Sequence, residues 1–274
     1  MNYLHQNTPS RRSFLKTSIA ASTLLGATSL PLLGSDVAKR TSKIKALLIT
    51  GGGYHDFESQ KTILTEGVGK FVDIDWTVLH QDNADKLKKT LSEKGWADPY
   101  DVIVYNICHA HEKDTEYVNS LVKVHKEGKA MVAIHCTMHS YHWNTEADAS
   151  GEKEWNQLLG VVSMKHGPRG PGIKMTQTES RHDSYTPANK EWSTPKGELY
   201  HIEKVYPTAT VLAHGNNGKS EHPTIWVNKY EKANVFATSI GHHNQTMQDD
   251  AYLKTIADGI TWAVTQTKLD LAKS

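Results

Sequence analysis

The chain has 274 residues, a length that holds one large domain or two small ones. Its 31 basic and 30 acidic residues give a net charge of +1. This balance argues against a nucleic-acid partner, since binding a phosphate backbone requires a basic face. Hydrophobic residues make up 38% of the chain, enough for a buried core, so the composition excludes a disordered protein. Histidine is abundant, with 16 residues, which suggests metal binding or proton transfer.

The N-terminal residues have the layout of an export signal. Residues 10–16 read Ser-Arg-Arg-Ser-Phe-Leu-Lys, and residues 18–33 are small and apolar. This pattern predicts a twin-arginine signal over residues 1–36 and a periplasmic protein. The alternative is a membrane anchor, but the apolar run is short and rich in Ser, Thr and Ala. We therefore expect no stable membrane anchor once the signal is removed.

The first half of the remaining chain alternates between strand and helix patterns. Apolar runs predict strands at residues 44–50, 72–80, 101–108 and 130–135. Amphipathic patterns predict helices at residues 58–71, 83–94 and 114–126. This alternation is typical of βαβ units, in which helices cover both faces of a mostly parallel sheet.

The second half has a different rhythm. Residues 137–200 are rich in Gly, Pro, Ser and His, and we expect a loop-rich insertion there with one short helix near residues 152–159. Strands follow at residues 208–213, 224–230 and 234–240, the last two as a hairpin, and a helix at residues 249–263 closes the fold. The sequence thus predicts one α/β domain over residues 43–268.

Several predicted strands end in segments rich in histidine and aromatic residues. In an open parallel sheet, ligands bind beyond the carboxyl ends of the strands. We therefore expect these segments to surround one cleft, although scattered histidines that cap loops are an alternative. The segments contribute Tyr54, His55, Asp56, His109, His111, His135, His139, Trp143, His242 and His243.

Two kinds of chemistry suit such a cleft. Neutral imidazoles of His55, His135 and His242 could hold zinc or a similar divalent ion, with a position left open for water. Alternatively, one histidine acts as a general base, oriented by Asp56 or Glu112, while others hydrogen-bond a polar substrate. The sequence has no HExxH motif that would favour the metal.

Cys136 and the glycines at residues 51–53 allow further interpretations. Cys136 follows a strand at a turn where a nucleophile could stand, and a Cys136–His242 hydrolase is one hypothesis. The turn lacks flanking glycines, which favours a packed cysteine instead. Since Cys108 is the only other cysteine, the sequence predicts no disulfide framework. Residues 51–53 lack a nucleotide-binding pattern, so we expect no nucleotide cofactor and a close approach of backbone to a ligand.

Three stretches of the chain resemble the ThuA-like (trehalose-utilisation) family, which is related to class I glutamine amidotransferases. They are residues 47–56, 133–166 and 222–262, with a shorter match at Glu198-Leu199-Tyr200. The resemblance implies a flavodoxin-like open sheet without the amidotransferase Cys-His-Glu triad. It also implies a link to sugars, including oxidised (3-keto) disaccharides. Residues 163–195 depart from the family pattern.

The resemblance suggests roles for individual residues. By analogy with amidotransferases, His135 and Cys136 stand at the nucleophile turn, and His242 stands at the position of the catalytic histidine. We expect a hydrolase or lyase that acts on a disaccharide or keto-sugar glycoside, with His55, His135, His242 and Asp56 as catalytic residues.

The remaining candidates would bind the sugar. They are Tyr54, His109, His111, His139, Trp143, His166 and His243. The alternative function is a carbohydrate-binding protein without turnover, since no paired carboxylates of an ordinary glycosidase are evident. In either case the expected partner is a small carbohydrate, and the sequence predicts no oligomeric state.

Overall fold

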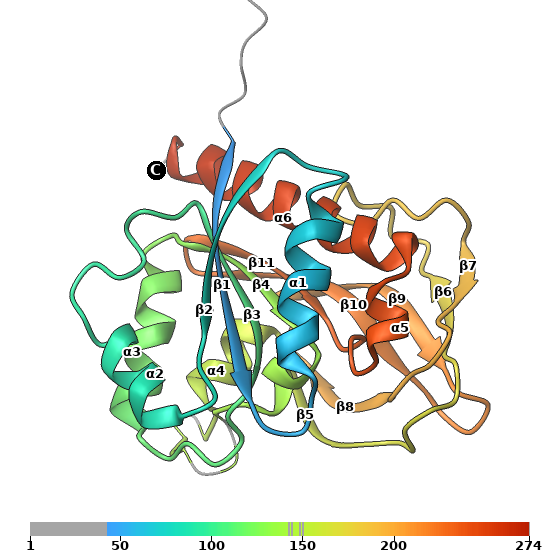
Figure 1. Ribbon diagram of the computed structural model, residues 1–274, viewed down its shortest axis with the longest axis horizontal. Coiled ribbons are helices and arrows are strands. Elements are labelled where there is room, and N and C mark those ends of the chain that lie inside the picture. The colour runs from blue at the N-terminus through green and yellow to red at the C-terminus, as the bar shows by residue number, and fades with distance from the viewer. Residues whose placement is uncertain (1–42, 142, 144, 148, 150, 274) are drawn as a thin grey trace, which may run out of the picture. The chain divides into compact units, whose positions relative to one another are not determined.

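The computed structural model describes residues 43–273 except 142, 144, 148 and 150 (Figure 1). The expected signal at residues 1–36 lies outside these residues and stays a prediction. No helix within the described part of the chain combines the length and apolar character needed to cross a bilayer.

Five strands form the parallel half of a nine-stranded sheet, in the order β2-β1-β3-β4-β11. They are β1 (Ile44–Gly52), β2 (Ile74–His80), β3 (Val102–Cys108), β4 (Ala130–Ile134) and β11 (Ala233–Thr238). All residues of β3, β4 and β11 are buried, as expected for strands covered on both faces. The predicted α/β fold is confirmed.

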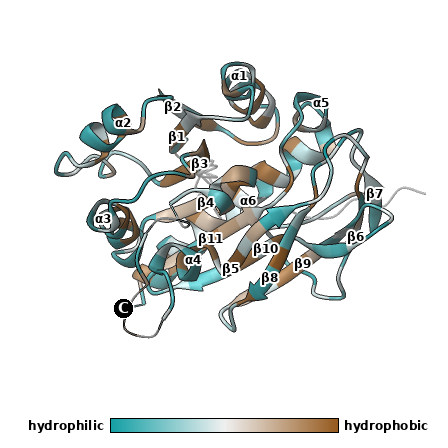
Figure 2. Cartoon of the chain, turned by 90° about the horizontal axis from the view of Figure 1, so that it is seen from below, coloured by the Kyte–Doolittle hydropathy of each residue, from teal (hydrophilic) through white to brown (hydrophobic). Residues whose placement is uncertain are grey.

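Helices cover both faces of this sheet (Figure 2). On one face, α1 (Phe57–Val68) and α6 (Asp250–Leu271) pack against alternate strand residues such as Leu48 and Val104. The other face packs against α2 (Ala84–Leu91), α3 (Thr115–Lys126) and α4 (Glu154–Leu159). The longer helices begin at side chains that accept a hydrogen bond from a first-turn amide. These capping residues are Asp56, Asn83, Asp114 and Asp249.

The second half contains more strands than the sequence predicts. β9 (Ala209–Asn216) and β10 (Glu221–Tyr230) continue the sheet from β11 in antiparallel fashion, and β10–β11 is the expected hairpin. The expected loop region also holds four strands, which corrects the prediction there. They are β5 (Val161–His166), β6 (Lys174–Gln177), β7 (Glu191–Ser193) and β8 (Tyr200–Val205).

These four strands escape prediction because they are short and pair with distant segments. β6 joins the edge of the large sheet beside β9, and β5 pairs with β8 in a separate two-stranded sheet. Short helical segments, η1 (His135–His139) and α5 (Asn244–Met247), follow β4 and β11. These two segments start the loops that carry the histidines discussed below.

His125 is a structural histidine that should make stability depend on pH. It is fully buried on α3, where its Nδ1–H donates to the Lys129 carbonyl (2.8 Å) and its Nε2 accepts from the Tyr105 hydroxyl (3.1 Å). Burial lowers the pKa of His125 from its ordinary 6.5 to about 4. The unfolded chain therefore binds this proton more tightly, so stability present above pH 6.5 is lost as the pH falls toward 4.

We expect His125→Gln to flatten this pH dependence. From about pH 7.5 to about pH 5, the free energy of unfolding of the wild type should fall by about 2 kcal/mol more than that of the variant. Urea unfolding at both pH values measures the difference, and His111→Gln on the exposed surface is the matched control. Equal pH dependence in wild type and His125→Gln would contradict the assignment.

Candidate functional site

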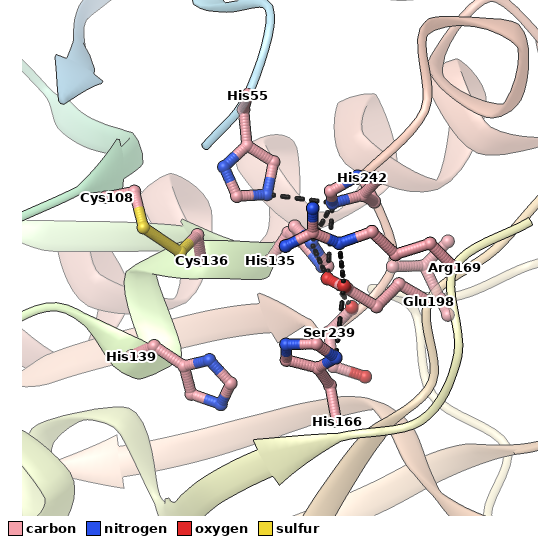
Figure 3. A network of polar contacts seen from close by, with 12 residues as sticks. His55, Cys108, His135, Cys136, His139, His166, Arg169, Glu198, Ser239 and His242 are labelled. Atoms are coloured by element: carbon pink, nitrogen blue, oxygen red, sulfur yellow. Dashed lines mark hydrogen bonds and ion pairs between the residues drawn. A yellow bond between two sulfur atoms is a disulfide. The ribbon is translucent and has the colours of Figure 1, made fainter. Parts of the chain in front are cut away.

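Three histidines from separate loops meet beyond the carboxyl edge of the parallel strands (Figure 3). His55 lies between β1 and α1, His135 begins η1 after β4, and His242 follows β11. Their ring centroids are 4.6 Å apart for His55 and His242, 5.0 Å for His55 and His135, and 5.4 Å for His135 and His242. The parallel pairing brings these distant segments together.

A buried carboxylate completes this cluster. Glu198 precedes β8 and is 3% exposed. Its Oε2 lies 3.2 Å from both His135 Nε2 and His242 Nδ1. Its Oε1 accepts from Arg169 Nε (2.7 Å) and lies 3.1 Å from His166 Nδ1. We call His55, His135, Glu198 and His242 the His–Glu cluster.

Backbone carbonyls orient two of the imidazoles. His135 Nδ1–H donates to the Ser239 carbonyl (2.7 Å), and His55 Nδ1–H donates to the Gly53 carbonyl (3.2 Å). In these tautomers the Nε2 lone pairs face His242 Nδ1, at 3.0 Å from His55 and 3.4 Å from His135. A single His242 N–H cannot satisfy two imidazole lone pairs and a carboxylate. The arrangement therefore favours a cation at the centre of the cluster.

Protonation states in the His–Glu cluster suit a metal cation. Burial, together with the neighbouring His135 and His242, lowers the pKa of His55 to about 3. Burial also lowers the pKa of His135. Burial alone would raise the pKa of Glu198, but hydrogen bonds from His135, His242 and Arg169 hold it well below its usual range. At neutral pH, two neutral imidazoles therefore lie beside an ionised carboxylate, and such groups are metal ligands.

The distances also permit coordination. One ligand atom from each member of the His–Glu cluster lies within 4.8 Å of the others. Three nitrogens and one oxygen form a donor set that zinc accepts. The carbonyls that hold the outer N–H groups of His55 and His135 are the usual outer partners of metal-bound histidine.

The backbone at the end of β4 is strained at His135. This residue has φ +45°, a left-handed conformation that costs free energy for a residue with a Cβ. Such strain occurs often at functional sites. Of the two residues placed at this turn by the sequence, His135 holds the unusual conformation and its ring faces the cluster.

Cys136 forms a disulfide with Cys108. The Cys136–His242 hydrolase hypothesis is therefore wrong for this form of the protein, and so is the expectation of no disulfide. The two cysteines are 28 residues apart and lie at the ends of the paired strands β3 and β4. A count of two cysteines could not reveal that the sheet places them side by side.

A cavity of about 370 Å³ opens beside the His–Glu cluster. Tyr200 forms part of its wall, and its ring stacks parallel to His139 at a centroid distance of 3.9 Å. Trp143, which is 39% exposed, lies 5.4 Å from His139 between ring centroids. Other described residues along the cavity are Tyr54, His55, Lys165, His166, Arg169 and Glu198. A larger groove, of about 720 Å³, lies between α2 and α3 and has no histidine among its described lining residues.

The structure places several predicted site residues away from this cavity. His109 and His111 line a separate hollow, where the Tyr54 hydroxyl lies 3.4 Å from His111 Nε2. His243 borders a further open hollow on the other side of His242. The substrate-binding roles expected for these three histidines therefore have no support from the cavity beside the His–Glu cluster.

Neither carboxylate expected to orient a histidine does so. Asp56 caps α1 by accepting from the Ser59 amide (3.1 Å) and also accepts from Asn244 Nδ2 (2.7 Å). Glu112 accepts from the amides of the two residues that follow it. Glu198 has the role that the sequence predicted for Asp56 or Glu112. Its only sequence signal was the Glu198-Leu199-Tyr200 match, and Arg169 and Tyr200 were missed as well.

Similar solved structures define the class of fold. A ThuA-like protein from Parabacteroides merdae matches with a TM-score of 0.66 and 18% identity, over 82% of this chain and 91% of that one. A ThuA-like protein from Bacteroides uniformis matches with 0.62 and 12%, over 80% and 91%. A GMP synthase component from Thermoplasma acidophilum matches with 0.54 and 13%, over 85% and 98%. The fold is therefore glutamine amidotransferase-like.

The family follows from the sequence match. A family model described as ThuA, trehalose utilisation, matches residues 45–263. The chain belongs to the ThuA family, whose description is carbohydrate-related. A comparison with curated proteins found no match.

Proposed function

We propose that this protein is an exported hydrolase or lyase that acts on a disaccharide or keto-sugar glycoside through the His–Glu cluster. The observation that carries the proposal is the convergence of three imidazoles and a buried carboxylate at one end of a cavity. The family description supports a carbohydrate as the substrate. The size of the cavity suits a small molecule, and the exposed rings of Trp143 and Tyr54 offer apolar faces for a sugar.

Zinc or a similar divalent ion is the proposed cofactor of the His–Glu cluster. Such an ion, when bound, would polarise a carbonyl oxygen or lower the pKa of a water molecule. His55, His135, Glu198 and His242 would hold it. The Gly53 and Ser239 carbonyls would keep the His55 and His135 rings in the ligating tautomers.

His166 is the proposed proton-transfer group. Its Nδ1 lies 3.1 Å from Glu198 Oε1 and 2.9 Å from the Gly167 carbonyl, so Nδ1–H has acceptors and Nε2 carries the lone pair. Its side chain is 38% exposed and lines the cavity. It can therefore take a proton from a sugar carbon or from water, while Glu198 keeps the ring oriented.

The disulfide supports the proposed export. Disulfides persist in oxidising compartments such as the periplasm and are rare in the cytosol. Cys108–Cys136 is therefore consistent with the twin-arginine signal expected from the sequence.

The test compares metal content and turnover in matched variants. Zinc-loaded protein is incubated with a disaccharide and with its 3-keto derivative, and products are separated by chromatography. We expect His242→Ala to lose both zinc and product formation, and His166→Gln to keep zinc but form product at least about a hundredfold more slowly. His214→Ala, outside the cavity lining, should match wild type.

Two outcomes would overturn the proposal. Sugar binding without product in the wild type would favour the alternative of a non-catalytic carbohydrate-binding protein. Full turnover in His242→Ala would show that the reaction does not depend on the cluster.

A further inference from the structure

The disulfide lies in the wall of the cavity, next to the His–Glu cluster. Cys108 ends β3, and Cys136 stands in η1 directly after β4, so the parallel pairing of these strands brings them together. Their exposed fractions are 5% and 4%, and both line the cavity. A small thiol that enters the cavity can therefore reach the sulfur atoms.

His55 belongs to two donor sets. One ring nitrogen of His55 and the two sulfur atoms lie within 4.8 Å of one another. His55 also contributes to the His–Glu cluster, and Figure 3 shows its ring between the disulfide and His242. One imidazole nitrogen can ligate only one ion at a time, because the other nitrogen of His55 donates to the Gly53 carbonyl.

The chemistry of the second donor set depends on the oxidation state of the cysteines. Disulfide sulfurs are weak ligands, whereas thiolates bind zinc and copper(I) strongly. A dithiol reductant would transfer two electrons and two protons to Cys108–Cys136 and become a disulfide itself. A metal ion would then displace the two thiol protons to bind both sulfurs.

We propose that Cys108, Cys136 and His55 form a second, redox-controlled metal site. When the cysteines are reduced, the site takes a thiophilic ion such as zinc through two sulfurs and one nitrogen, with an open fourth position on the cavity side. When they are oxidised, the site does not form, and His55 serves the His–Glu cluster. Reduction thus withdraws one ligand from the cluster and leaves His135, Glu198 and His242 in place.

Cobalt(II) is the probe for this site, because thiolate ligation gives cobalt an intense near-ultraviolet charge-transfer band that nitrogen and oxygen ligands do not produce. The experiment uses Glu198→Gln protein, in which the His–Glu cluster is weakened, reduced and then freed of reductant without air. We expect the band to appear in the reduced protein, and to be absent from the disulfide form and from Cys136→Ser.

Two further variants separate ligation from a general effect on folding. His55→Ala should bind cobalt to the reduced cysteines at least about tenfold more weakly, since loss of a direct ligand costs no less than loss of its outer partner. His109→Ala, which changes a histidine next to Cys108 outside this donor set, should bind as the parent does. Near-ultraviolet circular dichroism confirms that each variant is folded.

The proposal fails if reduced protein shows no sulfur-to-cobalt band, or if His55→Ala binds cobalt as tightly as its parent. Its outcome is separate from that of the proposed function, which concerns zinc and turnover in the oxidised protein. Cobalt could bind the reduced cysteines even if the His–Glu cluster held no metal, and the reverse also holds.

Discussion

Glu198→Gln is expected to abolish zinc binding by the His–Glu cluster and, with it, turnover. Among the described residues, this carboxylate is the only anion that contacts both His135 and His242, and glutamine has its shape without its charge. Loss of a direct ligand should weaken zinc affinity and lower kcat by at least about a hundredfold. Isothermal titration with zinc and product formation from the keto-sugar measure the two effects.

The matched control for this change is Glu203→Gln. Glu203 lies on β8 only a few residues further along the chain, and it is exposed. It should leave zinc affinity and kcat as in wild type. Zinc affinity of Glu198→Gln equal to that of wild type would show that the carboxylate is not a ligand.

Gly52→Ala should be strongly destabilising, because the new methyl group would collide with a neighbouring strand. Gly52 has φ +104°, and a Cβ there would lie 2.3 Å from the Cys108 carbonyl oxygen. Neither backbone can move without breaking the β1–β3 pairing. Left-handed strain and overpacking together should lower the free energy of unfolding by about 3 kcal/mol or more.

Gly53→Ala is the control for this prediction, one residue further along the chain. A Cβ on Gly53 would meet no heavy atom of the described residues within 4 Å, so its free energy of unfolding should stay within about 0.5 kcal/mol of wild type. Urea unfolding measures both variants. A Gly52→Ala protein as stable as Gly53→Ala would refute the collision.

The glycines show where sequence reasoning reached the right property for the wrong reason. The sequence indicated that the backbone at residues 51–53 must approach something closely. The structure shows that Gly51 and Gly52 approach the backbone of Gln81 and Cys108 rather than a ligand. The identity of a neighbouring atom depends on strand pairing, which a local pattern does not contain.

Strand-end histidines could be predicted for the same reason that parallel strands could. Long apolar runs such as those of β3 and β4 indicate strands buried on both faces, and parallel strands end at one edge. The structure accordingly brings His55, His135 and His242 together. It separates His109 and His111, because side chains in a loop follow its local turns and not the strand direction.

The carboxylate partner could not be chosen from the sequence. Asp56 and Glu112 are near the histidines along the chain, yet their oxygens accept from amides of their own segments. Glu198 is distant from all three histidines in sequence and reaches them because β8 folds back beside β5. Proximity in sequence is therefore a poor guide to which acid faces a histidine.

The sequence by itself determined the α/β class, the order of the parallel strands along the chain and the family, since these depend on hydrophobic periodicity and local motifs. Only the tertiary structure decided that Glu198 joins the histidines and that Cys108 meets Cys136. Both depend on contacts between segments far apart in the chain. Such contacts arise from the packing of the whole sheet, and no local stretch of residues encodes them.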